Sequence, residues 1–188
     1  MRYDGAMTEP VPWLDARERA AWLRLAAMVE LLPGTLSQQL ERDADLSHFE
    51  YYVLAMLSEA HDRTLAMSAL AQRTNATLPR LSHVVRRLEN RGLVERSGCP
   101  TDRRVTMAHL TPAGWDLVVD TAPGHVRHVR SLILDGLTSE QVDQLHEITA
   151  AILDRIDPRG CMVDFYTDPA DTSGGTAAAD GAPEAKTA

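Results

Sequence analysis

The sequence predicts a mainly helical protein of the α+β class, in which several helices accompany one short antiparallel hairpin. Three observations support this prediction. Apolar residues recur at helical spacing over most of the chain, Ser or Thr caps stand at three of the expected helix starts, and one pair of adjacent segments has strand character. A chain of 188 residues suits one domain with a single core.

The composition narrows the possible function classes. Hydrophobic residues make up 44% and charged residues 24%, as in a globular protein, and no apolar run has the length of a membrane span. The first residues carry acids and prolines where a signal peptide has a basic start and an apolar stretch, so we expect a cytoplasmic protein with no membrane partner. Cys99 and Cys161 are too few for a disulfide framework or a four-thiolate zinc site.

The first two helices are predicted from apolar patterning and from a cap. Residues 14–32 are apolar nearly all round, which indicates burial on more than one side. The Pro-Gly pair at 33–34 should kink or interrupt this helix. A second helix begins at Ser47, which forms a capping box with Glu50.

A helix-turn-helix and a hairpin follow. A short helix over 68–73 and a longer helix over 77–91 are joined by the linker TNAT, and Gly92 ends the second of them. Residues 93–98 and 104–110 suit two strands, with the turn sequence GCPTDR between them.

Two more helices complete the domain. Thr111 is an N-cap followed by Pro112 at the first helical position, so a long helix begins there, and the Pro-Gly pair at 123–124 should bend it. The last helix begins with a capping box from Thr138 to Gln141 and runs to about Ile156.

The two ends of the chain are expected to lie outside the domain. Residues 1–12 should be flexible, and residues 159–188 are mostly small or polar and should form a disordered tail, which leaves the domain at 13–158. A group of larger side chains early in this tail has the character to dock back onto the domain: Cys161, Met162, Phe165 and Tyr166.

Charge is distributed unevenly along the chain. Residues 63–104 contain nine arginines against three acids, so this segment has a net charge of +6 while the rest of the chain has −14. A basic block on an acidic body is typical of a protein that binds a polyanion such as DNA.

The helix predicted over 77–91 places its basic residues on one face. Its apolar stripe consists of Leu78, Leu81, Val84, Val85 and Leu88. The opposite face and its flanks carry Pro79, Arg80, Ser82, His83, Arg86, Arg87 and Asn90. Such a face suits the DNA major groove, where arginine reads guanine and asparagine reads adenine. The alternative is an ordinary solvated charged face.

The hairpin turn adds a second basic feature directly after this helix. Asp102 can hold one neighbouring guanidinium through a bidentate pair, which leaves the other free for the DNA backbone, and a narrow A·T minor groove attracts such an arginine. Many hairpin turns carry Asp and Arg for solubility alone. That alternative leaves the order of helix, turn, basic helix, hairpin and capped helix unexplained.

The chain resembles the multiple antibiotic resistance regulator (MarR) family of winged-helix transcription factors. The resemblance is carried by LSHFEYYVLAML, by RLENRGLVER followed by DRR and LTPAG, and by LTSEQVDQL. It implies a homodimer built from helices within 13–46 and 111–157, and a DNA-binding lobe at 47–110. Helix 77–91 would lie in the major groove and the wing at 98–104 in the minor groove of a pseudo-palindromic duplex. The DNA-binding residues would be Ser68, Thr77, Pro79, Arg80, Ser82, His83, Arg86, Arg87, Asp102, Arg103 and Arg104.

The resemblance also implies a regulatory signal. Members commonly bind small aromatic molecules between the dimer helices and the DNA-binding lobe, so we expect a ligand-responsive repressor. Residues with the character to line such a crevice are Trp22, Met28, His48, Tyr51, Tyr52 and Trp115, although most of them also suit a buried core. Alternatives are redox sensing through Cys99, whose pKa the nearby arginines would lower, and a protein-binding adaptor.

Enzyme and metal-binding functions have little support. No acid, base and oxyanion donor gather around Cys99 in the sequence, so we expect no catalysis and no cofactor. His125 and His128 lie one helical turn apart, but no carboxylate is placed to complete a metal site, and we expect both histidines to be solvated.

Overall fold

The computed structural model describes residues 11–162, and the expectations for residues 1–10 and 163–188 lie outside this range. The fold is mainly helical with one small antiparallel sheet, as predicted. In chain order the elements are α1 (Ala16–Ala44), α2 (His48–Ser58), a 3₁₀ turn (His61–Arg63), β1 (Thr64–Ala66), α3 (Met67–Arg73), α4 (Leu78–Asn90), β2 (Val94–Gly98), β3 (Thr106–Leu110), α5 (Pro112–Val129), a π-helical turn (Arg130–Leu134) and α6 (Ser139–Ile156).

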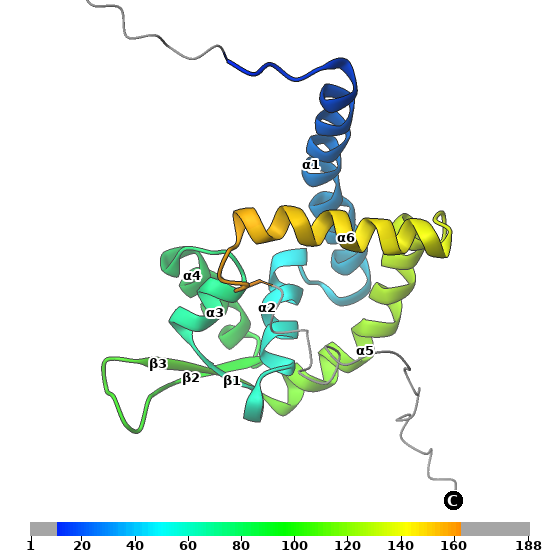
Figure 1. Ribbon diagram of the computed structural model, residues 1–188. Coiled ribbons are helices and arrows are strands. Elements are labelled where there is room, and N and C mark those ends of the chain that lie inside the picture. The colour runs from blue at the N-terminus through cyan, green and yellow to red at the C-terminus, as the bar shows by residue number, and fades with distance from the viewer. Residues whose placement is uncertain (1–10, 163–188) are drawn as a thin grey trace, which may run out of the picture.

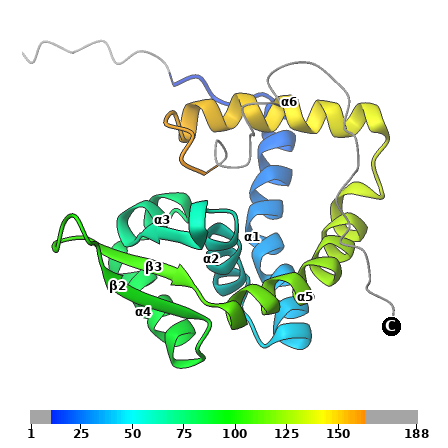
Figure 2. The ribbon, with the colours of Figure 1, turned by 90° about the horizontal axis from the view of Figure 1, so that it is seen from below.

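The elements form two parts (Figures 1 and 2). Helices α2, α3 and α4 pack with the sheet into a lobe, from which the loop between β2 and β3 projects. Helices α1, α5 and α6 stand beside this lobe, and the N-terminal half of α1 extends away from the rest of the molecule (Figure 1). The expected division of the chain, with a DNA-binding lobe at 47–110 and dimerisation helices on either side, stays a prediction.

The sheet has three strands in the order β1-β3-β2, whereas the sequence predicted only the β2–β3 hairpin. The additional strand pairs with β3, with Thr64 opposite His109. His109 also joins the strands through its ring: Nδ1 lies 2.8 Å from the Thr64 hydroxyl and Nε2 lies 2.7 Å from the Ser97 hydroxyl. β1, which directly precedes α3, is therefore hydrogen-bonded to the base of the hairpin.

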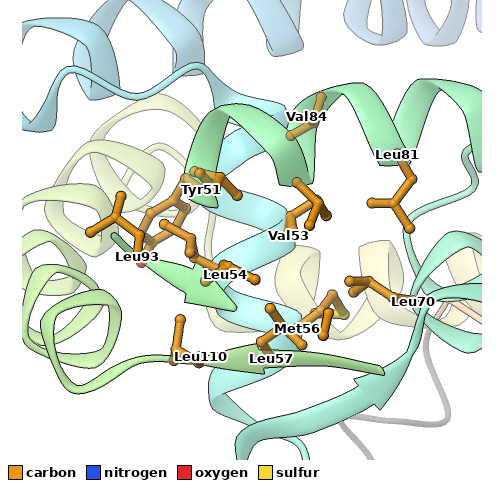
Figure 3. Close-up of a cluster of buried hydrophobic side chains, with 14 of the residues drawn as sticks. Tyr51, Val53, Leu54, Met56, Leu57, Leu70, Leu81, Val84, Leu93 and Leu110 are labelled. Carbon is orange, nitrogen blue, oxygen red and sulfur yellow. The ribbon is translucent and has the colours of Figure 1, made fainter. Parts of the chain in front are cut away.

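The core lies inside the lobe. Side chains from α2 meet those of α3, α4 and the strands, and Figure 3 shows them pointing toward one another. Those with no exposed surface include Leu54, Met56 and Leu57 of α2, Leu70 of α3, and Leu81 and Leu88 of α4. The helix-turn-helix and the hairpin are thus fixed on one rigid support.

The predicted caps are present. Ser47 and Glu50 form a capping box at α2, and Thr138 and Gln141 form one at α6. Thr111 caps α5 by accepting a hydrogen bond from the backbone N–H of Gly114 at 3.0 Å. These local signals set the helix starts because each satisfies N–H groups that the first turn leaves without partners.

The expected interruption at Pro33 is wrong, because α1 continues through it as one helix of 29 residues. Pro33 and Val29 are both exposed. Water can therefore bind the Val29 carbonyl group that the proline leaves without its helical donor. Helix α5 contains Pro123 within its 18 residues, and the π-helical turn follows directly after Val129.

The three long helices expose much apolar surface. Trp13, just before α1, is 85% exposed and Ile156 of α6 is 72% exposed. Other large exposed side chains on these helices are Trp22, Leu23, Met28, Val29, Leu31, Val119, Val126 and Ile148. Between residues 11 and 162, no helix is both long and apolar enough to span a bilayer.

Candidate nucleic-acid interface

Helix α4 has the two contrasting faces that the sequence predicts. Thr77 caps it, and its hydroxyl accepts a hydrogen bond from the backbone N–H of Arg80 at 3.4 Å. Its buried residues are Leu81, Val84, Val85 and Leu88, while Pro79, Arg80, His83, Arg86, Arg87 and Asn90 are exposed and Ser82 is half-buried. Leu78 corrects the expectation: it is 50% exposed, because the first turn of α4 extends beyond the core.

The exposed side chains of α4 differ in how firmly they are held. The Arg80 guanidinium stacks over the Phe49 ring of α2, with its central carbon 4.3 Å from the ring centroid. Among the described residues, His83 and Arg86 have no hydrogen-bond or ion-pair partner. The Phe49 ring therefore restrains the Arg80 side chain, whereas the side chains of His83 and Arg86 are available to a ligand.

Arg87 is bound to a buried acid rather than extended into solvent. Its Nε donates to Oε1 of Glu50 at 3.0 Å, and its Nη2 donates to the same oxygen. The Glu50 side chain is only 7% exposed and also accepts from the backbone N–H and hydroxyl of Ser47. Burial raises the pKa of Glu50, but the hydrogen bonds from Ser47 and Arg87 outweigh it and lower the pKa overall. The pair thus locks α4 to the start of α2.

Replacing Glu50 by glutamine should destabilise the protein by about 1 to 2 kcal/mol at pH 7, because the charged hydrogen bonds to Arg87 are lost. Since folding lowers the pKa of Glu50, its contribution is present above the unfolded value of 4.5 and is lost as the pH falls through the folded value. The difference in the free energy of unfolding between wild type and Glu50→Gln, measured by urea denaturation, should therefore become smaller below pH 4.5. Glu95→Gln, at an exposed site on β2, is the control; an equal effect there would contradict this role.

The wing carries the predicted bidentate pair. Arg104 Nε donates to Asp102 Oδ1 at 3.0 Å and Arg104 Nη2 donates to Asp102 Oδ2 at 2.9 Å. The Arg104 backbone N–H also donates to Oδ1 at 3.0 Å. These bonds lower the pKa of Asp102 and raise that of Arg104, although the Arg104 side chain is 91% exposed. Arg103 beside it is exposed and has no such partner within the described chain.

Several of the predicted residues border one hollow of about 300 Å³ between the wing, α3 and α4. Its lining includes Ser68, Ser82 and Arg104, so residues far apart in the sequence converge there. Arg96 of β2 also lines it and was not predicted. Its Nε donates to Glu89 of α4 at 2.8 Å. An acid seven residues before an arginine across a helix-to-strand turn is too common a pattern to have identified this pair.

A second unpredicted contact joins α4 to α1. Arg91, the C-cap of α4, donates through Nη1 to the backbone carbonyl of Asp45 at 2.6 Å. Asp45 is itself the left-handed C-cap of α1, with φ of 51°. The end of the long helix is thus attached directly to the end of the basic helix.

Cys99 lies at the base of the wing, as expected, and is half-buried. Its pKa is lowered, but the leading cause is the hydrogen bond with the Thr101 hydroxyl at 3.3 Å, followed by backbone hydrogen bonds from Thr101 and Asp102. The arginines expected to lower this pKa are not among its causes. Redox sensing at Cys99 stays a prediction.

The six candidate ligand residues do not share one cavity in the described chain. Tyr52 lines a pocket of about 770 Å³ between α3 and the end of α6. Tyr51 belongs to the core, and His48 stacks on Tyr52 with ring centroids 6.3 Å apart. The remaining three lie elsewhere: Trp22 and Met28 are exposed on α1, and Trp115 packs beneath the guanidinium of Arg63.

The two histidines of α5 are half-buried, which corrects the expectation that they are solvated. His125 Nδ1 lies 3.2 Å from Oε1 of Gln39, and its ring contacts Tyr51 at 4.7 Å between centroids. Burial, together with His48 and His128 nearby, lowers the pKa of His125. Within residues 11–162, no three His, Cys, Asp or Glu side chains are grouped as metal ligands.

The chain is similar in sequence and in fold to known transcriptional regulators. A family model described as the MarR family matches residues 44–105. The HTH-type transcriptional regulator MhqR of Bacillus subtilis (strain 168) is 31% identical over 103 residues, which are 55% of this chain and 69% of MhqR.

Two solved structures from Streptomyces coelicolor cover most of the described chain. Sco3205, a MarR family transcriptional regulator in complex with DNA, is 41% identical with a TM-score of 0.74, and the match covers 78% of this chain and 95% of Sco3205. AbsC, another MarR family transcriptional regulator, is 34% identical with a TM-score of 0.72, covering 77% of this chain and 97% of AbsC.

Proposed function

Because the chain belongs to the MarR family of DNA-binding transcriptional regulators, we propose that it acts as a homodimeric repressor that reads a pseudo-palindromic operator and responds to a small aromatic molecule. Family members are transcription regulators, and this chain is not an enzyme. The observation that carries the proposal is the combination of the exposed basic face of α4 with Arg104 oriented by Asp102 on the adjoining wing.

The two basic features serve different parts of the duplex. Arg80, His83 and Arg86 project from a helix on a rigid support, and they read base edges in the major groove. Arg104 enters the minor groove, while Arg103 and Ser68 contact the phosphates. Arg87, with its guanidinium bound to Glu50, offers its remaining N–H groups to a phosphate and mainly sets the angle of α4.

Arg86→Ala should change the sequence preference, because Arg86 is exposed, has no partner among residues 11–162 and lies centrally on the proposed base-reading face. Selection from a random duplex library, followed by affinity measurements at several salt concentrations, tests this. Arg103→Ala is the matched control: it removes the same charge from the wing and should lower the salt dependence of binding while the selected motif stays the same. A wild-type motif recovered with Arg86→Ala would contradict the assignment, and wild-type protein that selects no motif would contradict the proposed function.

The exposed apolar surface of the long helices supports the homodimer. No residue of α6 is buried in the single chain, and α1 exposes both Trp22 and Leu23. Surfaces of this kind are normally covered by another protein. A two-fold dimer through these helices carries two copies of α4 to half-sites about one helical turn apart.

In solution the protein should have twice the chain mass of 20.7 kDa, measured by light scattering at micromolar concentration. Ile148→Arg places a charge on the exposed apolar stripe of α6 and should shift the mass toward the monomer. Asp143→Arg, at an exposed position about 140° around the helix from Ile148, should leave the dimer intact. A mass near 21 kDa for the wild type would refute the dimer and the two half-sites with it.

The ligand response is supported by the pocket that Tyr52 lines. Its volume of about 770 Å³ lies within the range of small-molecule sites, and it adjoins both the DNA-binding lobe and α6. A molecule bound there contacts the lobe and a dimer helix together. Repression itself requires only that the protein occupy its operator.

A further inference from the structure

The chain after α6 turns back toward the DNA-binding lobe instead of leaving the domain (Figure 1). Asp157 organises this turn: its carbonyl accepts from the backbone N–H of Gly160 at 2.8 Å, and its Oδ2 accepts from the backbone N–H of Met162 at 2.8 Å. Gly160 has φ of +62°, a conformation that suits glycine. Residues 159–162 are therefore held in a turn that Asp157 organises, and the boundary expected at 158 stays a prediction.

The turn delivers the chain to the pocket of about 770 Å³. Cys161 and Met162 are half-buried and form part of its lining. The rest of the lining comes from Tyr52 of α2, from α3, from the turn before α4 and its first residue, and from the end of α6 with the turn after it. Its apolar part includes Ala71, Ala76, Leu78, Leu153 and Ile156. Leu78 and Ile156 are 50% and 72% exposed, so the pocket presents apolar surface that the described residues leave uncovered.

The residues that follow Met162 have the chemistry to cover this surface. Val163, Phe165 and Tyr166 lie within four positions of it, and from Thr167 onward the chain carries mainly small, polar and acidic residues. Three residues span up to about 10 Å, so Phe165 can reach the interior of a pocket whose wall includes Met162. Asp164 can meet Arg159, which also lines the pocket.

We propose that Val163–Tyr166 occupies this pocket in the same chain, with the Phe165 and Tyr166 rings against Leu78 and Ile156. The segment then fastens the end of α6 to the start of α4. It also takes the space that a small aromatic ligand needs, so the ligand binds in competition with the chain's own aromatic residues. The docking stands on the pocket and the path of the chain, whereas the competition rests on the ligand response proposed above.

Photocrosslinking tests the docking without DNA or ligand. In the full-length chain, p-benzoylphenylalanine at position 165 should crosslink to pocket-lining residues such as Gln72, Asn75 and Leu78, identified by mass spectrometry. The same group at position 172, in the polar part of the tail, should give no preference for these residues. Crosslinks from position 165 that scatter or fall on α1 or α5 would overturn the proposal. In a mixture of isotopically heavy and light chains, crosslinks between chains would overturn the assignment to the same chain and point to the partner's tail.

Competition is tested with the fluorescent probe anilinonaphthalene sulfonate. Phe165→Ser combined with Tyr166→Ser should raise its affinity by about tenfold or more, because two aromatic side chains no longer fill the pocket. Thr167→Ala combined with Thr172→Ala, with two polar tail residues changed, should bind the probe as the wild type does. Adding Gln72→Trp to the double-serine variant fills the pocket from α3 and should reverse the gain. Equal probe affinity in all variants would overturn the competition. The crosslinks would still test the docking of the segment, and the duplex selection would still test the proposed function.

Discussion

Arg104→Ala should weaken binding to the selected duplex by roughly ten- to a hundredfold and reduce its salt dependence. Arg104 is the one wing arginine whose guanidinium is oriented, because two parallel hydrogen bonds to Asp102 fix its plane. An oriented group loses less rotamer entropy on entering a groove than a free one. Arg103→Ala, at a neighbouring exposed arginine, should have the smaller effect of a lost phosphate contact.

Asp102→Ala separates orientation from charge. The substitution makes the wing more positive, so charge alone would strengthen DNA binding. Loss of the fork, the pair of parallel hydrogen bonds between Arg104 and Asp102, should instead weaken DNA binding nearly as much as Arg104→Ala does. Glu95→Ala is the matched control, because it also removes one acid from the hairpin and leaves the fork intact. Fluorescence anisotropy at equal salt decides between them. If Asp102→Ala and Glu95→Ala strengthened binding alike, Asp102 would have no orienting role.

Gly114→Ala should destabilise the fold by about 3 kcal/mol, the largest effect on stability expected here. A Cβ at this position would lie well inside van der Waals contact of the Leu93 carbonyl oxygen and 2.7 Å from Cδ1 of Leu110. The Leu93 carbonyl cannot easily yield, because it accepts a hydrogen bond from the Thr111 backbone N–H at 3.1 Å. The first turn of α5 would have to move away from the lobe.

Gly124→Ala is the control on the same helix. A Cβ there would meet the side chains of Asp43 and Gln39 at 3.8 Å, an ordinary contact. Alanine should therefore stabilise α5 by about 0.5 kcal/mol through its better helix propensity. Urea denaturation should show that Gly114→Ala lowers the free energy of unfolding and that Gly124→Ala raises it. Equal destabilisation by the two variants would show that the close contacts at Gly114 are not the cause.

The features that the sequence predicted are mostly local. The caps at Ser47, Thr111 and Thr138 each depend on residues three positions apart, and the fork between Asp102 and Arg104 spans two positions. Such interactions are encoded within one turn of chain, so spacing alone identifies them. The two faces of α4 follow from a periodicity that the core then satisfies.

The features that were missed depend on contacts between distant residues. β1 has only three residues and owes its existence to β3, more than forty positions later. The link between Glu50 and Arg87 spans 37 positions, and its buried carboxylate looked from the sequence like a cap alone. The six ligand candidates do not line one cavity of the described chain, since aromatic residues suit both a core and a cavity and composition does not separate the two.

Because Arg91 is hydrogen-bonded to the end of α1, a change in the angle of α1 also moves the end of α4. The 29 residues of α1 span about 43 Å, with the far end standing away from the lobe and the near end bonded to the C-cap of α4. A tilt of about 5° at the far end displaces the near end by roughly 4 Å, whereas hydrogen bonds to base edges tolerate only a few tenths of an ångström. In the proposed dimer, small angular changes between the two copies of α1 would therefore be enough to bring Arg86 into register with the base proposed for it or take it out.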